Sequence, residues 1–494
     1  MIGCVSVTPT RSRGRVSPVR HLGPVLLPVV AGSLAIAGAT AADAPQRRPD
    51  FVRDVAPIVY TRCVTCHGPT QAAPFPLLSY DDVRAKGKEI VQVLSSRRMP
   101  PWSAAAAPGF PALQHERRLT LREVATLTTW VGAGMPAGDL SRAPLPPTFP
   151  MGWPLGIPSL TLTLPRAISI PADTADRVFN VVFGLGFPED RWIVAIDYAP
   201  TAKAALSHAL FFAVPATTAV DGGDMLPGIG GLVDAPPTPN LDERLAEAER
   251  TVETLGVWVP SILPARSPAA AAFRLPKRTN MVMQLHARAA DTGAIEDGNV
   301  AIYFTNARPA SPLMPLQVPP LFGIGAGIDL PAGESRITIS ETFTLPVDVT
   351  AFGARGHAHD LARDLKMTAT LPNGSTRGLL WIDRWQVAWQ DTYYFTAPVR
   401  LPKGTTVRVD MTYDNSAGNP RNRSIPPRRV TWGPALSEEI GSMDLIIAVP
   451  NDADAAALSA ARAAHLKVQR TKGPRDQGPI ARPLVPLRLL VVTR

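Results

Sequence analysis

The stretch Arg191–Tyr198 (RWIVAIDY) has an apolar residue at every second position. A period of two is typical of a β-strand, because successive side chains point to opposite faces. One face of this strand would carry Trp192, Val194, Ile196 and Tyr198. The same pattern recurs at 208–214 and at 407–413, so the larger part of the chain is predicted to be built from strands.

The composition also favours short strands over long helices. Proline accounts for 53 of the 494 residues, roughly double the usual ~5%. The dipeptide Asn373-Gly374 predicts a type I′ hairpin between two strands. Together these features predict two all-β, jelly-roll-like sandwiches, at 159–311 and 312–450, rather than one.

The N-terminus has the features of an export signal at 1–41. Arginines between Arg11 and Arg20 are followed by the mostly apolar stretch Leu22–Ala37 and by Ala39-Thr40-Ala41, an A-x-A cleavage site. An uncleaved anchor is the alternative, although two prolines interrupt the apolar run. Export predicts a periplasmic or extracytoplasmic protein.

The net charge of +9 is unevenly distributed. The leader holds four arginines and no acid, and the last 35 residues hold eight basic residues and one aspartate, so the body is slightly acidic. We therefore expect no nucleic-acid partner, and a basic tail at 451–494 that is a solvated appendage. After signal cleavage no apolar run is long enough for a membrane span.

The strongest motif is Cys63-Val64-Thr65-Cys66-His67. C-x-x-C-H is the attachment pattern for haem c: two thiols one helical turn apart can each bond a vinyl group, and the histidine can bind the iron. A thioredoxin-like redox pair and half of a zinc site are the alternatives. Neither a βαβ pattern nor a second C-x-x-C accompanies the motif, so haem c is favoured.

Helices are predicted on both sides of this motif. Asp50–Tyr60 has apolar residues on one helical face, and Thr120-Leu121-Arg122-Glu123 is a capping box that opens a second helix. The order of helix, C-x-x-C-H, loops and closing helix resembles a class I cytochrome c domain. The prediction is therefore a multidomain chain in which an all-α cytochrome c domain at 48–140 precedes the two sandwiches.

A class I cytochrome c also needs a sixth iron ligand, usually a methionine before the last helix. Met99, in Arg98-Met99-Pro100-Pro101-Trp102, is the candidate, with a core methionine as the alternative. Met135 follows the last helix and is the poorer candidate. Six prolines between 144 and 158 predict a semi-rigid linker at 141–158.

Four histidines in strand-like segments form the second signal, namely His208, His286, His357 and His359. His357 and His359 form an H-x-H pattern, and side chains two apart in a strand share a face. Two such imidazoles can chelate one metal with a third ligand from elsewhere, which suits copper or zinc. Alone, H-x-H is a weak signal, since exposed histidine pairs are common.

From the linker to about residue 450, the chain resembles the bacterial relatives of the copper type II, ascorbate-dependent monooxygenases. This is the family of dopamine β-monooxygenase and peptidylglycine α-hydroxylating monooxygenase, whose bacterial members often carry an N-terminal cytochrome c. The matching stretches occur in the family's order, at 189–192, 207–210, 284–286, 356–359, 401–404, 413–416 and 432–433.

The resemblance implies two copper sites, one in each sandwich, separated by a solvent-filled cleft. His208 and His286 would belong to the electron-storing site, and His357 and His359 to the catalytic, oxygen-binding site. Two positions depart from the family pattern. Ser207 stands where a further histidine is expected and Ile440 where a methionine ligand is expected; Met443 is near, but three residues away it points to the other face.

These features predict an exported protein that contains haem c and copper. A periplasmic donor would reduce the haem, and the copper sites would hydroxylate a C–H bond of an unidentified small molecule or peptide. The alternative is a non-catalytic electron-transfer or binding protein with degenerate copper sites. Metal-assisted hydrolysis is a further alternative, although no carboxylate clusters with the histidines in the sequence.

Overall fold

The computed structural model describes residues 47–69, 73–149, 152–172, 177–216, 252–260, 262–288, 293–433, 435–472 and 490–492. The signal peptide expected at 1–41 lies outside these residues, as do 473–489 and 493–494 of the expected basic tail. All the described residues from Arg48 onward belong to one compact unit.

The helices near the haem motif are short. They are a π-helical turn at Phe51–Val55, α1 (Ala56–Arg62), α2 (Tyr80–Ser95) and α3 (Leu121–Gly132). Ser79 and Asp82 form the capping box of α2, and Thr120 and Glu123 form that of α3, so the predicted cap of the closing helix is confirmed. Phe51, Leu127 and Trp130 are buried between them.

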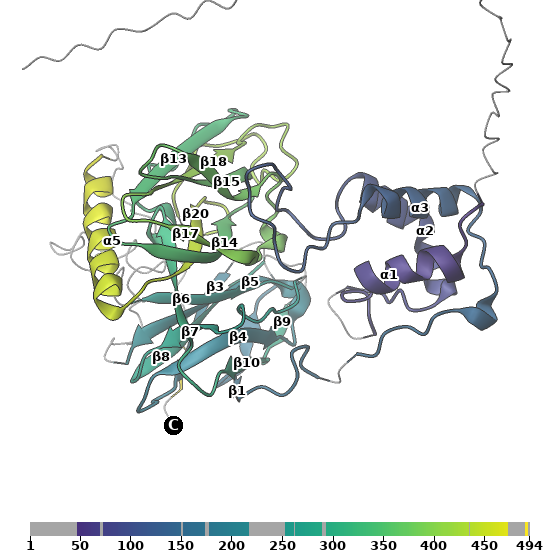
Figure 1. Cartoon of the computed structure of the whole chain (residues 1–494), viewed down its shortest axis with the longest axis horizontal. Helices are drawn as coiled ribbons and strands as arrows, with labels where there is room; N and C mark the ends of the chain where they lie inside the picture. Colours follow the sequence, from purple (N-terminus) through teal and green to yellow (C-terminus); the bar gives the residue numbers. More distant parts are fainter. Residues whose placement is uncertain are drawn as a thin grey trace, which may run out of the picture. The chain divides into compact units, whose positions relative to one another are not determined.

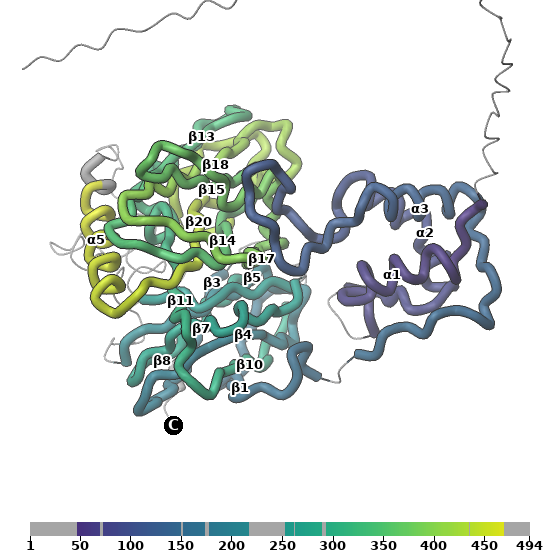
Figure 2. The backbone as a smooth tube through the Cα atoms, viewed as in Figure 1, coloured from purple at the N-terminus to yellow at the C-terminus, as the bar shows by residue number. Residues whose placement is uncertain are grey.

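Residues 96–119, which we call the arm, are extended and not helical. The arm crosses to the strands of the β-structure, where Ala104 pairs with Ile382 and Leu113 with Phe395 (Figure 2). Trp102 and Ala104 are buried in the same hydrophobic core as the strands of residues 337–447. The prediction of a separate all-α cytochrome c domain is therefore wrong: strands and not helices are the main regular structure, and the arm, which lies within 48–140, contributes to the core of a β-sandwich.

Strands are the main regular secondary structure of the described chain (Figure 1). One sheet has eight strands, in the order β1 (Leu160–Thr163), β10 (Asn299–Phe304), β4 (Arg191–Ala199), β7 (Ala271–Leu275), β11 (Ser311–Val318), β20 (Gly441–Ala448), β14 (Val349–Ala358) and β17 (Tyr393–Leu401). A second has four, β13 (Ile337–Thr344), β18 (Thr406–Tyr413), β15 (Ala362–Thr370) and β16 (Thr376–Ile382). A third has five, β21 (Leu490–Val492), β3 (Arg177–Gly184), β8 (Thr279–Ala287), β5 (Leu206–Pro215) and β6 (Glu253–Trp258).

The remaining elements are two small sheets, four short 3-10 turns and one further helix among the described residues. Two small sheets pair β12 (Asp329–Leu330) with β19 (Val430–Thr431), and β2 (Ile168–Ile170) with β9 (Ala294–Glu296). Four 3-10 turns are η2 (Leu140–Arg142), η3 (Lys203–Ala205), η4 (Leu321–Gly323) and η5 (Val387–Trp389). The last described helix is α5 (Asp452–Lys472).

The eight-stranded sheet runs through both halves of the β-structure. Its strands β7 and β11 pair in parallel, with Ala271 opposite Ser311 and Phe273 opposite Leu313. One end of the sheet packs with the five-stranded sheet and the other with the four-stranded sheet, through two separate cores. The described chain thus contains two sandwiches that share one sheet.

Two local predictions need refinement. The strand predicted at Arg191–Tyr198 is β4, but no residue from Trp192 to Tyr198 is exposed, because both faces of this central strand are covered. Asn373-Gly374 does connect the β15–β16 hairpin, yet only Gly374 has a positive φ, of 81°. A type I′ turn needs positive φ at both central residues, so the turn is of another type.

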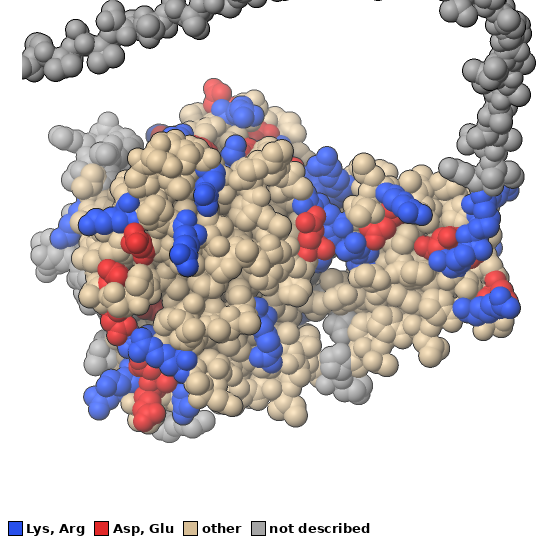
Figure 3. Space-filling model, viewed as in Figure 1, with Lys and Arg blue, Asp and Glu red and all other residues tan. Residues whose placement is uncertain are grey.

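The tail is also better packed than predicted. Helix α5 buries Leu458 against the core of the second sandwich and Leu466 beside Leu321, so this part of 451–494 is no solvated appendage. Among the residues that the structure describes, no helix is long and apolar enough to cross a membrane. On the face drawn in Figure 3, basic and acidic side chains are interspersed, with wide uncharged areas between them.

Candidate metal centres

The haem motif follows directly after α1. The backbone amides of Cys66 and His67 both donate to the Cys63 carbonyl, at 3.1 and 2.9 Å, which closes a tight turn around the two cysteines. Both thiols are free. Burial is the largest effect on the Cys63 thiol and raises its pKa to about 12, so this sulfur is held as a neutral thiol.

The His67 imidazole is oriented by its neighbour Phe75. Its Nδ1 lies 3.0 Å from the Phe75 carbonyl oxygen, which can only accept, so Nδ1 carries the proton and Nε2 is left as an acceptor. A ligand histidine in metalloproteins usually donates its other N–H in this way. Burial lowers the pKa of His67, against the Phe75 hydrogen bond. The donor set of two free thiols and one oriented neutral imidazole therefore fits haem c.

The two methionines considered as sixth ligand lie in different surroundings. Met99 precedes a cis peptide bond to Pro100 and its residue is 39% exposed. Met135 packs against α2 at Gly87, where its sulfur lies within 2.5 Å of the position a Cβ would take. Met135 belongs to the same hydrophobic cluster as Cys63. The structure thus leaves Met99 accessible and encloses Met135.

The four histidines of the β-structure lie in one group, which we call the histidine cluster. His208 on β5 is directly opposite His286 on the neighbouring strand β8. His357 lies on β14 of the eight-stranded sheet, and His359 follows that strand. All four are buried, with exposures between 0 and 8%. The first pair comes from one sandwich and the second pair from the other.

The rings of the cluster contact one another across the two halves. His208 and His286 are stacked, with centroids 4.1 Å apart and planes at 18°. The His208 and His357 centroids are 5.3 Å apart, and those of His357 and His359 are 6.5 Å apart, both pairs edge-on. The two pairs thus lie in direct contact, whereas the sequence resemblance implies two sites separated by a cleft.

One nitrogen of each imidazole lies within hydrogen-bonding distance of a neighbouring polar group. The Nδ1 of His357 donates to the Gln390 side-chain oxygen, and the Nδ1 of His359 donates to the Glu438 carbonyl at 2.9 Å. The His286 Nε2 lies 3.1 Å from the Gln284 amide oxygen, and the His208 Nδ1 lies 3.2 Å from the Ser207 hydroxyl. This pattern also matches metal-ligand histidines, whose second nitrogen is normally fixed.

The remaining nitrogens of the first pair have no hydrogen-bond partner among the described residues. These are Nε2 of His208 and Nδ1 of His286, both fully buried. A buried polar atom without a partner costs free energy of about 1–3 kcal/mol. Each of these two nitrogens is therefore a costly open site in the core.

Burial favours the neutral form of three histidines of the cluster, His208, His286 and His357. Burial lowers the pKa of His357 to about 4, despite the hydrogen bond to Gln390. Burial also places the pKa values of His208 and His286 well below their usual range, and the neighbouring histidines lower them further. Neutral imidazole is the form that binds copper or zinc.

Two residues near the cluster were not identified from the sequence. The Glu439 carboxylate is fully buried and accepts from the backbone amides of His359, Leu361 and Ile440. Burial raises its pKa to about 8. Gln390 is the partner of His357, and its own amide donates to the Val387 carbonyl at 3.1 Å. Neither belongs to a motif, and only the folded chain brings them to the histidines.

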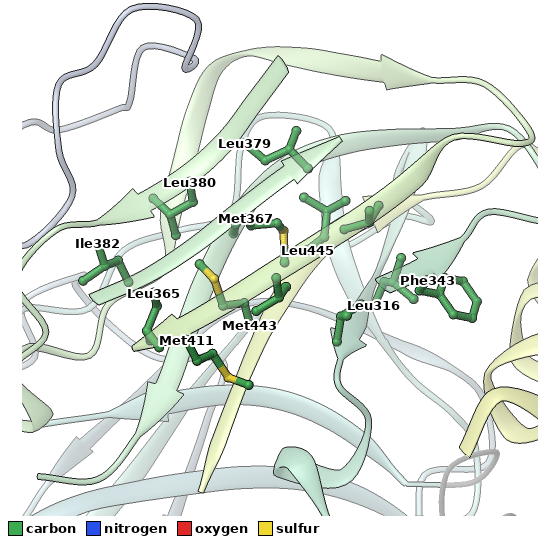
Figure 4. Packing of buried hydrophobic residues seen from close by; sticks show 14 of the residues in the cluster. Leu316, Phe343, Leu365, Met367, Leu379, Leu380, Ile382, Met411, Met443 and Leu445 are labelled. Atoms are coloured by element: carbon green, nitrogen blue, oxygen red, sulfur yellow. The ribbon is translucent and has the colours of Figure 1, made fainter. Parts of the chain in front are cut away.

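The two departures from the family pattern have structural consequences. Ser207 sits at a register shift of β5 and bonds to the imidazole of its neighbour His208. Met443 is fully buried and lies beside Met411 and Leu365 in the core of the second sandwich (Figure 4). In the β14–β20 ladder Ser442, not Met443, is opposite His357. Met443 is thus not placed to replace the methionine that the resemblance would have at Ile440.

The cluster fits copper by its donor type but not as a finished three-ligand site. Within the described ranges, no three histidine, cysteine, aspartate or glutamate side chains are arranged to hold one metal ion. Stacked rings have their in-plane lone pairs in parallel planes, so His208 and His286 cannot both point at one ion as they stand.

Comparisons with known proteins add no family to this geometry. No family model matches the chain, and no curated protein matches it. The solved structures with some likeness include PNGF-II, at 9% identity and a TM-score of 0.27. That match covers 59% of this chain and 65% of the PNGF-II chain. They also include Sulfolobus Turreted Icosahedral Virus (12% identity, TM-score 0.25, 63% of this chain and 97% of that one). A third is a peptide-N(4)-(N-acetyl-β-D-glucosaminyl) asparagine amidase, at 10% identity and a TM-score of 0.23. That match covers 58% of this chain and 97% of the amidase chain.

Proposed function

We propose that this chain is an exported redox protein that binds haem c and copper and hydroxylates a C–H bond with dioxygen. The observation that carries the proposal is the histidine cluster, in which two buried imidazoles from each sandwich are in contact. Burial of several imidazoles with open nitrogens is costly unless a ligand satisfies them. Copper is favoured among metals because imidazole suits it and the chain also has a haem motif.

Each residue has a defined task in this proposal. Gln390 and the Glu438 carbonyl fix the Nδ1 protons of His357 and His359, so that the Nε2 atoms are the donors. Phe322 would shield the ring of His357 from one side, since the two rings meet edge-on with centroids 5.2 Å apart. Copper, when bound, would supply one-electron chemistry toward dioxygen and a C–H bond. Cys63 and Cys66 would hold the haem covalently, and His67 would bind its iron.

The resemblance to the copper type II monooxygenases, on the motifs of residues 189–433, supports the reaction class. A periplasmic electron donor would reduce the haem, and the substrate would be a small molecule or a peptide. Export by the segment at 1–41 supports a periplasmic or extracytoplasmic location, where haem c is attached and copper is available.

A non-catalytic electron-transfer protein is the second candidate, and one specific observation favours it. The histidines are at most 8% exposed, and the stacked pair is not arranged for one ion. The cavity of about 80 Å³ near them is lined by Arg355 and Gln390 rather than by a histidine. A substrate would therefore need the cluster to open.

Dioxygen uptake separates the two candidates. The exported protein would be loaded with copper, reduced with ascorbate, and supplied with panels of small molecules and peptides. We expect uptake above background that His357→Ala abolishes, while His465→Gln, in α5 and outside the cluster, leaves it unchanged. Equal uptake by the wild type and His357→Ala, with the haem still cycling, would favour the electron-transfer candidate.

A further inference from the structure

We propose that a cavity at the start of strands β7 and β11 binds a small organic acid through Arg266 and Arg308. The cavity measures about 540 Å³, which is within the range of roughly 300–1,000 Å³ that is typical of small-molecule sites. Among the described residues, no member of the haem motif or of the histidine cluster lines it. This site is therefore separate from the proposed function and does not depend on it.

The cavity lies where two neighbouring parallel strands begin. Its walls are residues 266–271, which lead into β7, and residues 304–310, which lead into β11. The Ser311 amide, at the start of β11, donates to the Ala270 carbonyl at 3.0 Å and joins the two walls. Both walls are thus anchored to the shared eight-stranded sheet.

The first wall contains a strained residue. Ala270 has a φ of 61°, in the left-handed region that a residue other than glycine adopts only at a cost in free energy. Hydrogen bonds hold this conformation: the Ala271 amide donates to the Pro268 carbonyl at 3.0 Å, and the Ser267 hydroxyl donates to the Ala271 carbonyl at 2.6 Å. The Ser267 amide also donates to the carbonyl of Val194, another lining residue, at 2.8 Å. Such maintained strain is common at binding sites.

The charge of the lining is unbalanced. Arg266 and Arg308 each add a positive charge, and no aspartate or glutamate is among the described residues that line the cavity. The rest of the lining is mainly apolar, as at Val194, Phe304 and Pro309. A bare inorganic anion would pair with the arginines but leave this apolar surface in water. An organic acid satisfies both, because its carboxylate pairs with a guanidinium and its hydrocarbon body covers the apolar surface.

Aromatic rings orient both guanidinium groups. The Arg266 guanidinium lies over the Tyr303 ring of β10, 4.9 Å from its centroid, and its Nη2 donates to the Leu155 carbonyl at 3.2 Å. The Arg308 guanidinium lies over the Trp192 ring of β4, at 5.8 Å. Stacking uses the face of a guanidinium and leaves N–H groups at its edge for a planar carboxylate. Both arginines are thus oriented before a ligand binds.

Arg308 has one competing partner. Its Nη2 is 3.4 Å from a carboxylate oxygen of Asp452 at the start of α5, and the two side chains are 64% and 87% exposed. Exposed pairs of this kind contribute little to stability. A ligand carboxylate that enters the cavity can therefore replace Asp452 at Arg308.

Calorimetric titration of the exported protein with octanoate and with octanamide tests the site. The two probes have nearly the same shape and differ in charge. We expect octanoate to bind at least about tenfold more tightly, because hydrogen bonds between two charged groups are the stronger ones. Octanoate binding should also weaken as the salt concentration is raised. No binding of octanoate, or equal affinity for the two probes, would overturn the proposal.

Substitution of the two arginines locates the carboxylate. Arg266→Gln and Arg308→Gln should each lower octanoate affinity about tenfold and change octanamide affinity little. Arg266→Lys should keep part of the affinity, since it retains the charge but not the planar fork. Arg191→Gln is the matched control, because Arg191 also lies over a ring, that of Phe187 at 5.2 Å, but does not line the cavity. An equal loss in Arg191→Gln would overturn the site.

Two further variants keep the test independent of any loss of fold. Asn306→Asp adds a carboxylate at an exposed lining position with almost no change of shape, and it should weaken octanoate binding by repulsion. Asp452→Asn removes the competitor of Arg308 and should raise octanoate affinity by at most about fivefold. Misfolding cannot produce a gain in affinity. Unchanged octanoate affinity in both variants would overturn the placement of the carboxylate.

The C-terminal end of a peptide carries the same two groups, a carboxylate and an apolar body. Titration with an acetylated tripeptide that ends in a free phenylalanine carboxylate distinguishes this source. We expect octanoate to bind more tightly, because its narrow chain can lie wholly within the cavity. Tighter binding of the tripeptide would overturn the assignment to a free organic acid.

Discussion

The residues of the haem motif are close together in the sequence, whereas those of the histidine cluster are far apart in it and meet only in the fold. The residues of the haem motif lie within five consecutive positions, and one turn after α1 arranges them. The cluster takes its imidazoles from β5, β8, β14 and the segment directly after β14, and its histidines are separated by up to 151 positions in the sequence. The first is therefore a property of local sequence, and the second exists only when both sandwiches are folded on one shared sheet.

The largest effect is expected at the local motif. Changing Cys63→Ser and Cys66→Ser together removes both atoms that can bond the haem vinyl groups, so no covalent haem should remain. A haem-stained denaturing gel of the exported protein shows this as the loss of a band. His115→Gln, a change of histidine outside both centres, should keep the band. A wild-type protein without the band would contradict the haem prediction.

The next effect concerns the assembled cluster. His357→Ala removes one imidazole that contacts both His208 and His359. We expect copper affinity to fall by more than roughly a hundredfold, since second-shell changes alone cost about 10–100-fold. Titration calorimetry of the apo-protein measures it, with His465→Gln as the control. Unchanged affinity would show that copper binds elsewhere.

The contrast between the two regions also explains which sequence predictions held. Short-range patterns sufficed for the capping box of α3, the strand β4 and the β15–β16 hairpin. They did not suffice for the arm, because Trp102 is buried by residues such as Tyr393, nearly 300 positions away. The loop pattern of the arm therefore resembled part of a cytochrome c domain, although it is part of a β-core.

The same reason limits what could be predicted of the site. Four histidines were identified by type and spacing, but not that the two pairs would touch. Gln390 and Glu439 had no motif to mark them, since their function depends on strands that meet only in the fold. The orientation of Met443 could be predicted, because strand alternation is local.

The assembled cluster should make stability depend on pH. His357 has a pKa of about 4 in the folded state and about 6.5 when unfolded, so the unfolded chain binds more protons between these values. The contribution of His357 to the stability of the metal-free protein should be intact above pH ~6.5 and be lost toward pH ~4, by up to ~3 kcal/mol. Urea unfolding at several pH values checks the direction, and His357→Gln should weaken the slope.

Glu439 should change stability with pH in the direction opposite to His357. Its pKa of about 8 lies above the usual ~4.3, so the folded chain binds more protons between these values and loses stability as pH rises toward 8. Glu439→Gln should flatten this part of the curve. A curve that declines toward acid in His357→Gln as steeply as in the wild type would contradict the assignment.

The smallest effect is expected for Met443→Leu. The side chain lies in the core and away from the cluster (Figure 4), and a change of similar volume usually costs less than ~1.5 kcal/mol. Copper affinity should stay the same, because no ligand is lost. A clear loss of affinity with an intact fold would mean that this thioether reaches the metal after all.

Copper stoichiometry with spin counting tests the central claim most directly. Because the two histidine pairs are in contact, we predict one copper(II) per chain, with nitrogen hyperfine structure that both His208→Ala and His357→Ala alter. Those residues come from different sandwiches, so a shared effect requires one site assembled from both. Two independent copper ions per chain, each sensitive to only one of these substitutions, would contradict the account and restore two separate centres.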